Sequence, residues 1–133
     1  MSQTLFWLTL SLILTAVLWI PYILNALVVQ GVGAMGYQEG LPMLRPWAQR
    51  AKKAHYNAVE NLVLLAPATL AYVLLMGQNT GETLICALQI YFFSRLIHYV
   101  SYMVAVPYVR TLSFSSGWFA TLYILIKVYQ VAA

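Results

Sequence analysis

Long apolar runs dominate this chain and alternate with short polar segments. Residues 5–29 form the clearest run and contain no charged side chain. Three further runs occupy residues 54–76, 83–106 and 112–131. A helix needs about 20 mainly apolar residues to cross the hydrocarbon core of a bilayer. The pattern therefore predicts an all-α integral membrane four-helix bundle, in which residues 1–133 form one domain.

Helix-breaking residues separate these runs. Pro21 lies inside the first run and is expected to kink that helix, because proline lacks the N–H that an interior position needs. A Gly-Gln-Asn-Thr-Gly sequence at residues 77–81 predicts a tight turn between the second and third spans. Pro107 precedes the fourth run. The first run is expected to remain as a helix, because it lacks the basic start and the cleavage site of a signal peptide.

The composition excludes an ordinary water-soluble domain. Apolar residues make up 62% of the 133 residues and charged residues only 8%, whereas soluble domains are roughly half apolar and a quarter charged. The net charge of +4 does not indicate nucleic acid, because the basic residues flank or interrupt apolar segments. Cys86 is the only cysteine and there are two histidines, so no disulfide within the chain and no metal site are expected.

The distribution of charge predicts an orientation in the membrane. The first loop carries Arg45, Arg50, Lys52 and Lys53 against one glutamate, the second loop carries Glu82, and the third adds Arg110. Loops rich in lysine and arginine remain on the cytoplasmic side. Loops one and three are therefore expected in the cytoplasm, with both termini outside.

Two stripes of polar side chains interrupt the second and third spans. Lys53, Asn57 and Glu60 are spaced i, i+4 and i+7, and Arg95, His98 and Tyr102 are spaced i, i+3 and i+7. Each set lies on one helical face, and the two stripes overlap in depth. Arg110 stands at the start of the fourth span. The three spans are thus expected to form one polar pocket in the cytoplasmic half of the membrane.

Two interpretations of this pocket remain open at this point. A Glu60–Arg95 ion pair could simply hold two helices together. Alternatively, Lys53, Arg95 and Arg110 outnumber Glu60 and leave positive charge that is costly to bury alone. A ligand that carries carboxylates and an ammonium group would balance that charge.

The motifs resemble those of a known family of membrane proteins. The segment Arg-Ala-Lys-Lys-Ala-His-Tyr-Asn-Ala-Val-Glu-Asn at residues 50–61, with Pro67 beyond it, is similar to the R-A-H-x-N-x-x-E-N signature of the MAPEG family, the membrane-associated proteins in eicosanoid and glutathione metabolism. The agreement continues with Arg95, His98 and Tyr102, then with Pro107 and Arg110. The short loops and tails look most like the bacterial members related to microsomal glutathione transferases.

This resemblance implies a function. It implies a homotrimer in a bacterial inner membrane that binds glutathione between neighbouring subunits and takes a lipophilic electrophile or lipid hydroperoxide from the bilayer. Glutathione would be a co-substrate, and no metal would be needed. Arg110 would be the catalytic residue beside the thiol. The resemblance assigns glutathione binding to Lys53, Asn57, Glu60, Arg95, His98 and Tyr102, with Arg50, Thr111 and Phe114 as further candidates.

Some positions depart from the pattern of the family. Lys53 stands where eukaryotic members usually have arginine, so a bidentate contact becomes a point charge. Phe114 stands where some relatives have tyrosine, which removes a hydroxyl donor near the sulfur. Asn25 and Gln30 are neutral substitutes for an arginine that some relatives carry.

Thr111 is expected to cap the fourth helix or to donate a hydrogen bond to a thiolate.

Two other functions compete with thiol transfer. Small multidrug transporters also have four short helices, but they usually carry an acid in the first helix, and residues 5–29 contain none. A member of the same family that only binds and presents a lipid would share every motif described above. Thiol conjugation is the activity that separates an enzyme from such a protein.

Overall fold

The four apolar runs form four helical spans in the computed structural model of the protein, which describes residues 2–37, 39–77 and 80–133. The helices are α1 (Gln3–Val17), α2 (Ile20–Gln30), the short 3-10 helix η1 (Gly31–Met35), α3 (Pro46–Met76), α4 (Glu82–Met103) and α5 (Pro107–Ala132). No strand occurs among these residues. Four helical stretches, with α1, α2 and η1 forming one, are long and apolar enough to cross a membrane. The prediction of an all-helical chain with four spans is confirmed.

The first span is broken into two helices instead of being kinked at Pro21. The α1 helix ends at Val17, and Pro21 lies in the first turn of α2. Proline has no N–H to offer the carbonyl four residues earlier, and its ring clashes with that carbonyl. The carbonyl in question belongs to Val17, so the break falls one turn before the proline. The Tyr99 hydroxyl of α4 donates to the Leu18 carbonyl at 2.9 Å, which satisfies an acceptor at the break.

The other spans begin or end away from the limits of the apolar runs. The α3 helix begins at Pro46, eight residues before the apolar run that starts at residue 54. Immediately before this helix, the backbone N–H of Arg45 donates to the Asn25 side-chain oxygen at 3.1 Å. The α4 helix ends at Met103, before Ala105 with its φ of 65°. The α5 helix begins at Pro107, so Arg110 lies inside its first turn instead of preceding it.

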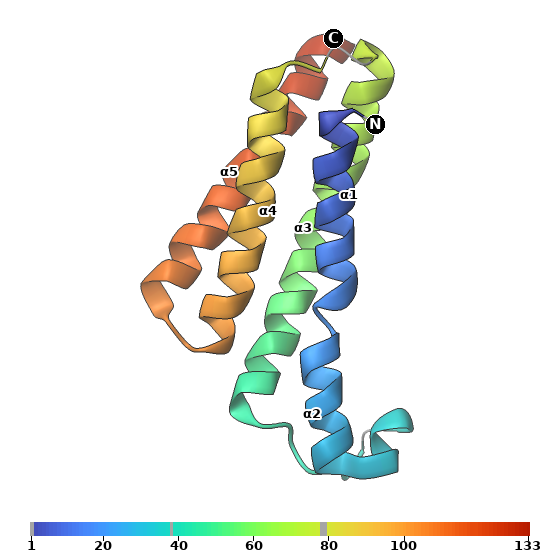
Figure 1. Ribbon diagram of the computed structural model, residues 1–133, viewed down its shortest axis with the longest axis vertical. Helices are drawn as coiled ribbons and strands as arrows, with labels where there is room; N and C mark the ends of the chain where they lie inside the picture. The colour runs from blue at the N-terminus through green and yellow to red at the C-terminus, as the bar shows by residue number, and fades with distance from the viewer. Residues whose placement is uncertain (1, 38, 78–79) are drawn as a thin grey trace.

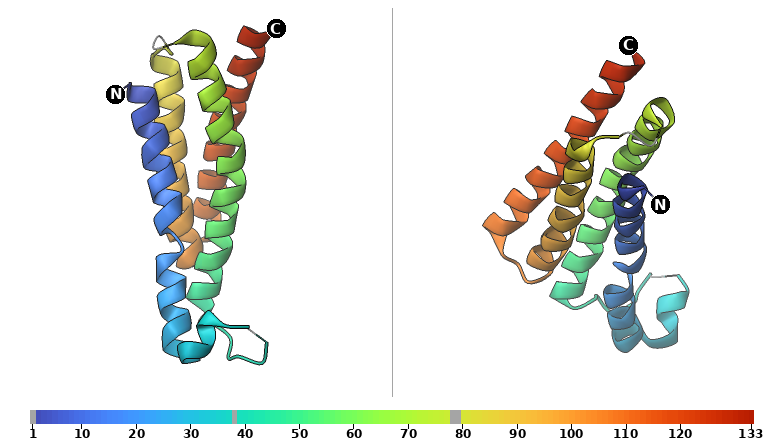
Figure 2. Two further views of the ribbon diagram at one scale, coloured as in Figure 1. Left: turned by 90° about the vertical axis from the view of Figure 1, so that its right-hand side faces the viewer. Right: turned by 45° about the horizontal axis from the view of Figure 1, so that its top comes forward.

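The helices lie roughly along the long axis of the molecule, with both termini at one end (Figure 1). The turn between α4 and α5 lies toward the opposite end, and α2 and the start of α3 extend beyond that turn (Figures 1 and 2). Gly77 and Gly81 have φ angles of 65° and 76°, which suits the predicted turn. Gln78 and Asn79 of that turn lie outside the described residues.

Two buried clusters hold the bundle together. Nearer the termini, large side chains from α1, α3, α4 and α5 meet; among them are Leu8, Leu65, Leu88, Tyr91 and Ile124. Toward the other end, the core is made of small residues of α3 against larger ones; among them are Leu18, Tyr22, Ala51, Ala54 and Tyr99. Small residues let helix backbones approach closely, as is typical of membrane proteins.

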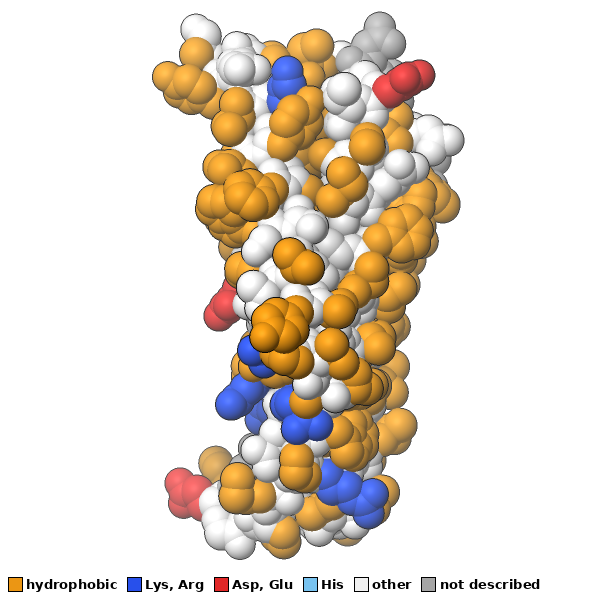
Figure 3. All heavy atoms as spheres, turned by 90° about the vertical axis from the view of Figure 1, so that its left-hand side faces the viewer, with side chains coloured by type: hydrophobic (Ala, Val, Ile, Leu, Met, Phe, Trp, Pro, Cys, Tyr) orange, Lys and Arg blue, Asp and Glu red, His pale blue; other side chains and the backbone are white. Residues whose placement is uncertain are grey.

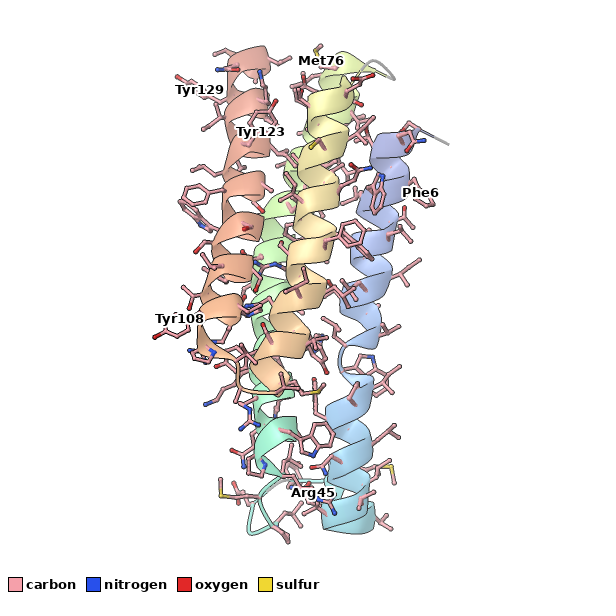
Figure 4. All side chains as sticks on the ribbon, turned by 60° about the vertical axis from the view of Figure 1, so that its left-hand side comes forward. Phe6, Arg45, Met76, Tyr108, Tyr123 and Tyr129 are labelled. Carbon is pink, nitrogen blue, oxygen red and sulfur yellow. The ribbon has the colours of Figure 1, made fainter. Side chains whose placement is uncertain are left out.

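The outer surface is mainly apolar. Figure 3 shows hydrophobic side chains over most of one face, with Lys and Arg side chains gathered in its lower part. Arg45 lies at this basic end, and Tyr123 and Tyr129 lie near the opposite end (Figure 4). Tyrosines near the ends of spans are typical of membrane–water interfaces. These features fit a multi-pass membrane protein.

Candidate functional site

The candidate site lies where α3, α4 and α5 pack against one another. Asn57 comes from α3, Arg95 and His98 from α4, and Arg110 and Phe114 from α5. Hydrogen bonds and ring contacts join these residues into one cluster. The prediction that the stripes of the second and third spans overlap in depth is therefore confirmed at Asn57 and Arg95.

Arg95 is the most enclosed charged residue of the cluster, with 2% of its surface exposed. Its Nη1 donates to Asn57 Oδ1 at 3.1 Å, and its Nη2 donates to the Phe114 carbonyl at 2.8 Å. The guanidinium also lies 5.6 Å from the Tyr91 ring centre and 5.3 Å from that of Phe114. These partners carry no formal charge. Arg95 is therefore held by neutral groups and not by an ion pair with Glu60, which the sequence had left open.

Asn57 links Arg95 to the rest of α3. The Asn61 side chain donates to the Asn57 backbone carbonyl at 2.8 Å and to Asn57 Oδ1 at 3.2 Å. The Asn57 side-chain oxygen therefore accepts from two donors, Arg95 and Asn61. Asn57 itself is half-buried, while Asn61 is buried.

His98 is buried one turn beyond Arg95. Its Nδ1 lies 3.0 Å from the Arg110 carbonyl, and because a carbonyl only accepts, Nδ1 carries the proton. Its Nε2 is buried and has no hydrogen-bond partner among the residues that the structure describes. The imidazole lies between the rings of Tyr102 and Phe114, with ring centres 5.6 and 5.8 Å away.

Arg110 has its backbone and its side chain in different roles. Its carbonyl accepts from His98 and from the Ser113 hydroxyl. The residue is half-buried, and its guanidinium lies 4.9 Å from the centre of the Tyr102 ring. Such a cation–π contact contributes about 0.5–1 kcal/mol near a surface. The stacking holds the positive charge beside His98 without enclosing it.

Three candidate residues of α3 lie outside this hydrogen-bonded cluster. Lys53 is exposed and lines a cavity of about 520 Å³ with Gln30, Lys52 and Tyr56. Glu60 is also exposed. Arg50 instead donates from its Nε to the Met103 carbonyl at 3.0 Å, so it ties α3 to the end of α4. Lys53 and Glu60 therefore present their charges on the outer surface of a single chain.

The expectation that Thr111 caps the fourth helix is wrong. The helix begins four residues earlier, and Val106 is the capping position. The Thr111 hydroxyl donates to the Pro107 carbonyl at 3.2 Å, within the helix. Phe114 contributes to the cluster through its backbone carbonyl and its ring, neither of which depends on the hydroxyl that a tyrosine would add.

The sequence alone did not assign Gly117 to the site, and it indicated Tyr91 only as part of a lipid-facing and packing surface, although Tyr91 is fully buried. A Cβ at residue 117 would lie 2.5 Å from Arg95 Nη2 and in contact with Ser94 Oγ, so only glycine leaves space for the guanidinium. Tyr91 packs its ring against Arg95 from one turn earlier on α4. The signal that could have identified Gly117 is a glycine inside an apolar helix, which often marks a close approach between spans.

No group of three His, Cys, Asp or Glu side chains able to hold a metal ion occurs among residues 2–37, 39–77 and 80–133. The site instead offers cations, an amide, an imidazole and aromatic rings. These groups can bind an anionic or zwitterionic organic ligand through charge-assisted hydrogen bonds.

Fold and site together define a small helical membrane protein with four spans and a cationic cluster between three of them. Comparison with protein families finds a match to the MAPEG family model over residues 4–129. The chain belongs to the MAPEG family. Comparisons with curated proteins and with solved structures give no match.

Proposed function

We propose that the protein is a membrane-bound glutathione transferase of bacterial type that conjugates the glutathione thiolate to lipophilic electrophiles. Membership of the MAPEG family, which includes glutathione transferases, supports this proposal. The single observation that carries it is the placement of Arg110, a half-buried residue whose guanidinium lies over the Tyr102 ring and whose backbone carbonyl accepts from His98. A thiolate needs such a cation next to it.

The chemistry follows from the acidity of a thiol. A free cysteine thiol has a pKa of about 8.5, so it is mostly protonated at neutral pH, and the thiolate is the nucleophile. Each pKa unit of depression requires about 1.4 kcal/mol of preferential stabilisation of the thiolate. Arg110 would supply this stabilisation, because its charge interacts with S⁻ and not with S–H. The thiol proton leaves to water.

Two reactions are open to the same thiolate. In conjugation, the sulfur forms a bond to an electrophilic carbon, and either a leaving group departs with its electron pair or the adduct takes up a proton. In peroxide reduction, the sulfur attacks the outer oxygen of a lipid hydroperoxide, and the O–O bond breaks. The alkoxide takes up a proton and leaves as an alcohol, and a second glutathione converts the sulfenic acid to the disulfide and water.

The remaining polar groups would hold the tripeptide. Glu60 is a partner for the ammonium group of glutathione, and Lys53 for a carboxylate. Asn57 would bond its amide groups, and His98 and Tyr102 would orient the cysteinyl part. The groups that accept from the Arg95 guanidinium are neutral, and the Arg110 guanidinium lies over the uncharged Tyr102 ring, so an anionic ligand would also balance their charge.

A homotrimer with glutathione between neighbouring subunits forms part of the proposal. Glu60 lies within a span yet is exposed in the single chain. A carboxylate facing lipid costs several kilocalories per mole. A neighbouring subunit and a bound ammonium group would together remove Glu60 from lipid.

The role of Arg110 is tested by rapid mixing. Glutathione is mixed with the purified protein in detergent, and the ultraviolet absorbance of the thiolate is recorded. We expect a thiolate signal at pH 7 in the wild type, a loss of about tenfold or more of that signal in Arg110→Ala, and partial retention in Arg110→Lys. Arg45→Ala is the matched control, because Arg45 is exposed at the basic end.

Turnover of a lipid-soluble electrophile, measured on the same preparations, separates an enzyme from a lipid-presenting protein. Conjugation that disappears in Arg110→Ala supports the transferase. A folded wild type that binds lipid but gives neither thiolate nor conjugate would overturn the proposal in favour of the lipid-presenting function.

A further inference from the structure

The role of Arg95 follows from where its hydrogen bonds go. The resemblance to the family assigns it to the ligand, but the side chain is 2% exposed. Asn57 Oδ1, the Phe114 carbonyl and, at 3.5 Å, the Ser113 carbonyl accept from its two Nη atoms. Rings of Tyr91 and Phe114 pack against it. A guanidinium so enclosed has little surface left for a soluble tripeptide.

These bonds also determine which way the Asn57 amide faces. A guanidinium can only donate, so the Asn57 atom that faces Arg95 is the oxygen. The Asn61 amide group that lies 2.8 Å from the Asn57 backbone carbonyl must likewise be its nitrogen, because a carbonyl only accepts. That nitrogen is also 3.2 Å from Asn57 Oδ1. The Asn57 oxygen is thus held by two donors, and within the described parts of the chain its Nδ2 donates to no protein atom.

Arg95 acts at the same time on α5. The carbonyls of Ser113 and Phe114 lie one turn beyond Arg110 on that helix. Gly117, one turn further, leaves the space that the guanidinium fills. Arg95 therefore connects the α3 position that carries Asn57 to the α5 turn next to Arg110.

We infer that Arg95 is a buried positioning residue that never contacts the ligand: it turns the Asn57 side-chain NH₂ toward the bound ligand as a donor and fixes the distance between Asn57 and Arg110. The ligand class that Asn57 would recognise is a carbonyl or carboxylate oxygen. This inference rests on the proposed glutathione site, and it adds that Asn57 serves as a donor whose orientation Arg95 sets.

Asn57→Asp separates the two functions of the asparagine. Aspartate keeps an oxygen that accepts from Arg95, and it gives Arg95 a negatively charged partner in place of a neutral one. It loses the NH₂ donor. The inference predicts that Asn57→Asp in detergent unfolds at an equal or higher temperature than the wild type, while its Kd for radiolabelled glutathione in equilibrium dialysis rises by roughly tenfold. Asn57→Ala should lose both thermal stability and affinity.

Gln89→Glu is the matched control, an amide-to-carboxylate change at a half-buried position of α4. It should lower the unfolding temperature and leave the Kd unchanged. Arg95→Lys, which replaces the planar fork of donors by a single ammonium, should lower the unfolding temperature and raise the Kd. Arg95→Lys should raise the Kd for glutathione monoethyl ester by the same factor as the Kd for glutathione, because no carboxylate of the ligand contacts Arg95.

The outcomes distinguish this inference from the proposed function. A lower unfolding temperature for Asn57→Asp, an unchanged Kd for that variant, or an Arg95→Lys penalty that vanishes with the ester would each overturn the inference. A wild type that binds no glutathione would refute the proposed ligand. The unfolding temperatures would still decide, without any ligand, whether Arg95 holds the Asn57 oxygen.

Discussion

Gly117 is the residue on which the position of Arg95 depends most directly. The guanidinium occupies the space into which any larger side chain at this position would project. Arg95 itself reaches α5 only because the two helices approach so closely. One missing methyl group on α5 thus allows a charged side chain of α4 to be buried among carbonyls and rings.

Gly117→Ala is therefore expected to lower the free energy of unfolding by about 1–3 kcal/mol, the cost of overpacking a dense core. Alanine is otherwise the better helix former by about 1 kcal/mol, so the sign of the change is informative. Thermal unfolding in detergent measures it. Ser116→Ala, an exposed neighbour on the same helix, should change little, and a stabilised Gly117→Ala would contradict the packing described here.

Several residue roles could be predicted from spacing, and others could not. The i, i+4 and i+7 spacing places Asn57 on one face of the second span, and the overlap in depth predicted for the two polar stripes is found at Asn57 and Arg95. Spacing could not show which side chain of α3 meets Arg95, and the pair that the sequence left open was Glu60–Arg95. That choice depends on the rotation of α3 about its axis, which turns Glu60 to the surface and Asn57 toward α4.

At the scale of elements, the break between α1 and α2 shows how a proline acts at a distance of one turn. Tyr99 on α4 donates to the Leu18 carbonyl released there, and Leu18 is 5% exposed. An aromatic residue of one span thus supplies a donor to a carbonyl at the break in another, next to the Val17 carbonyl that Pro21 leaves without its partner.

Tyr99→Phe should destabilise the protein by about 1–3 kcal/mol, because a buried carbonyl would lose its donor. The melting temperature of the purified protein in detergent measures this effect. Tyr129→Phe is the control, since Tyr129 is 74% exposed and should tolerate the change. Equal effects of the two substitutions would show that the Tyr99 hydroxyl does not support the break.

Hydropathy located the helices but not their ends. The run at residues 54–76 was apparent because it is apolar, whereas Pro46 to Lys53 is polar and still helical. Its helical signals are Pro46 at the first position and residues with good helix propensity after it. Similarly, α4 stops at Met103 although the apolar run continues to residue 106, because Ala105 takes a positive φ.

At the scale of the whole molecule, the two termini share one end, and the basic loop occupies the other (Figures 1 and 3). An even number of spans requires the first of these features. Which end faces the cytoplasm stays a prediction from the positive charge of the first loop.

Labelling of single cysteines tests that orientation. In a Cys86→Ala background, Gln3→Cys and Gln130→Cys should react with a membrane-impermeant maleimide added to intact cells, and Met43→Cys should react only after the membrane is opened. All three positions are exposed. The opposite pattern would place the basic loop outside.

The unequal lengths of the helices bear on how the protein responds to its lipid surroundings. The 22 residues of α4 extend about 33 Å, close to the roughly 30 Å of a bilayer's hydrocarbon. The 31 residues of α3 extend about 46 Å, and their basic end projects past the α4–α5 turn. Hydrophobic mismatch is relieved by tilting or by local thinning of lipid. The length of α4 therefore determines how deeply the bundle sits in the bilayer. The thickness of the bilayer then determines how far the cationic end of α3 extends beyond the lipid headgroups.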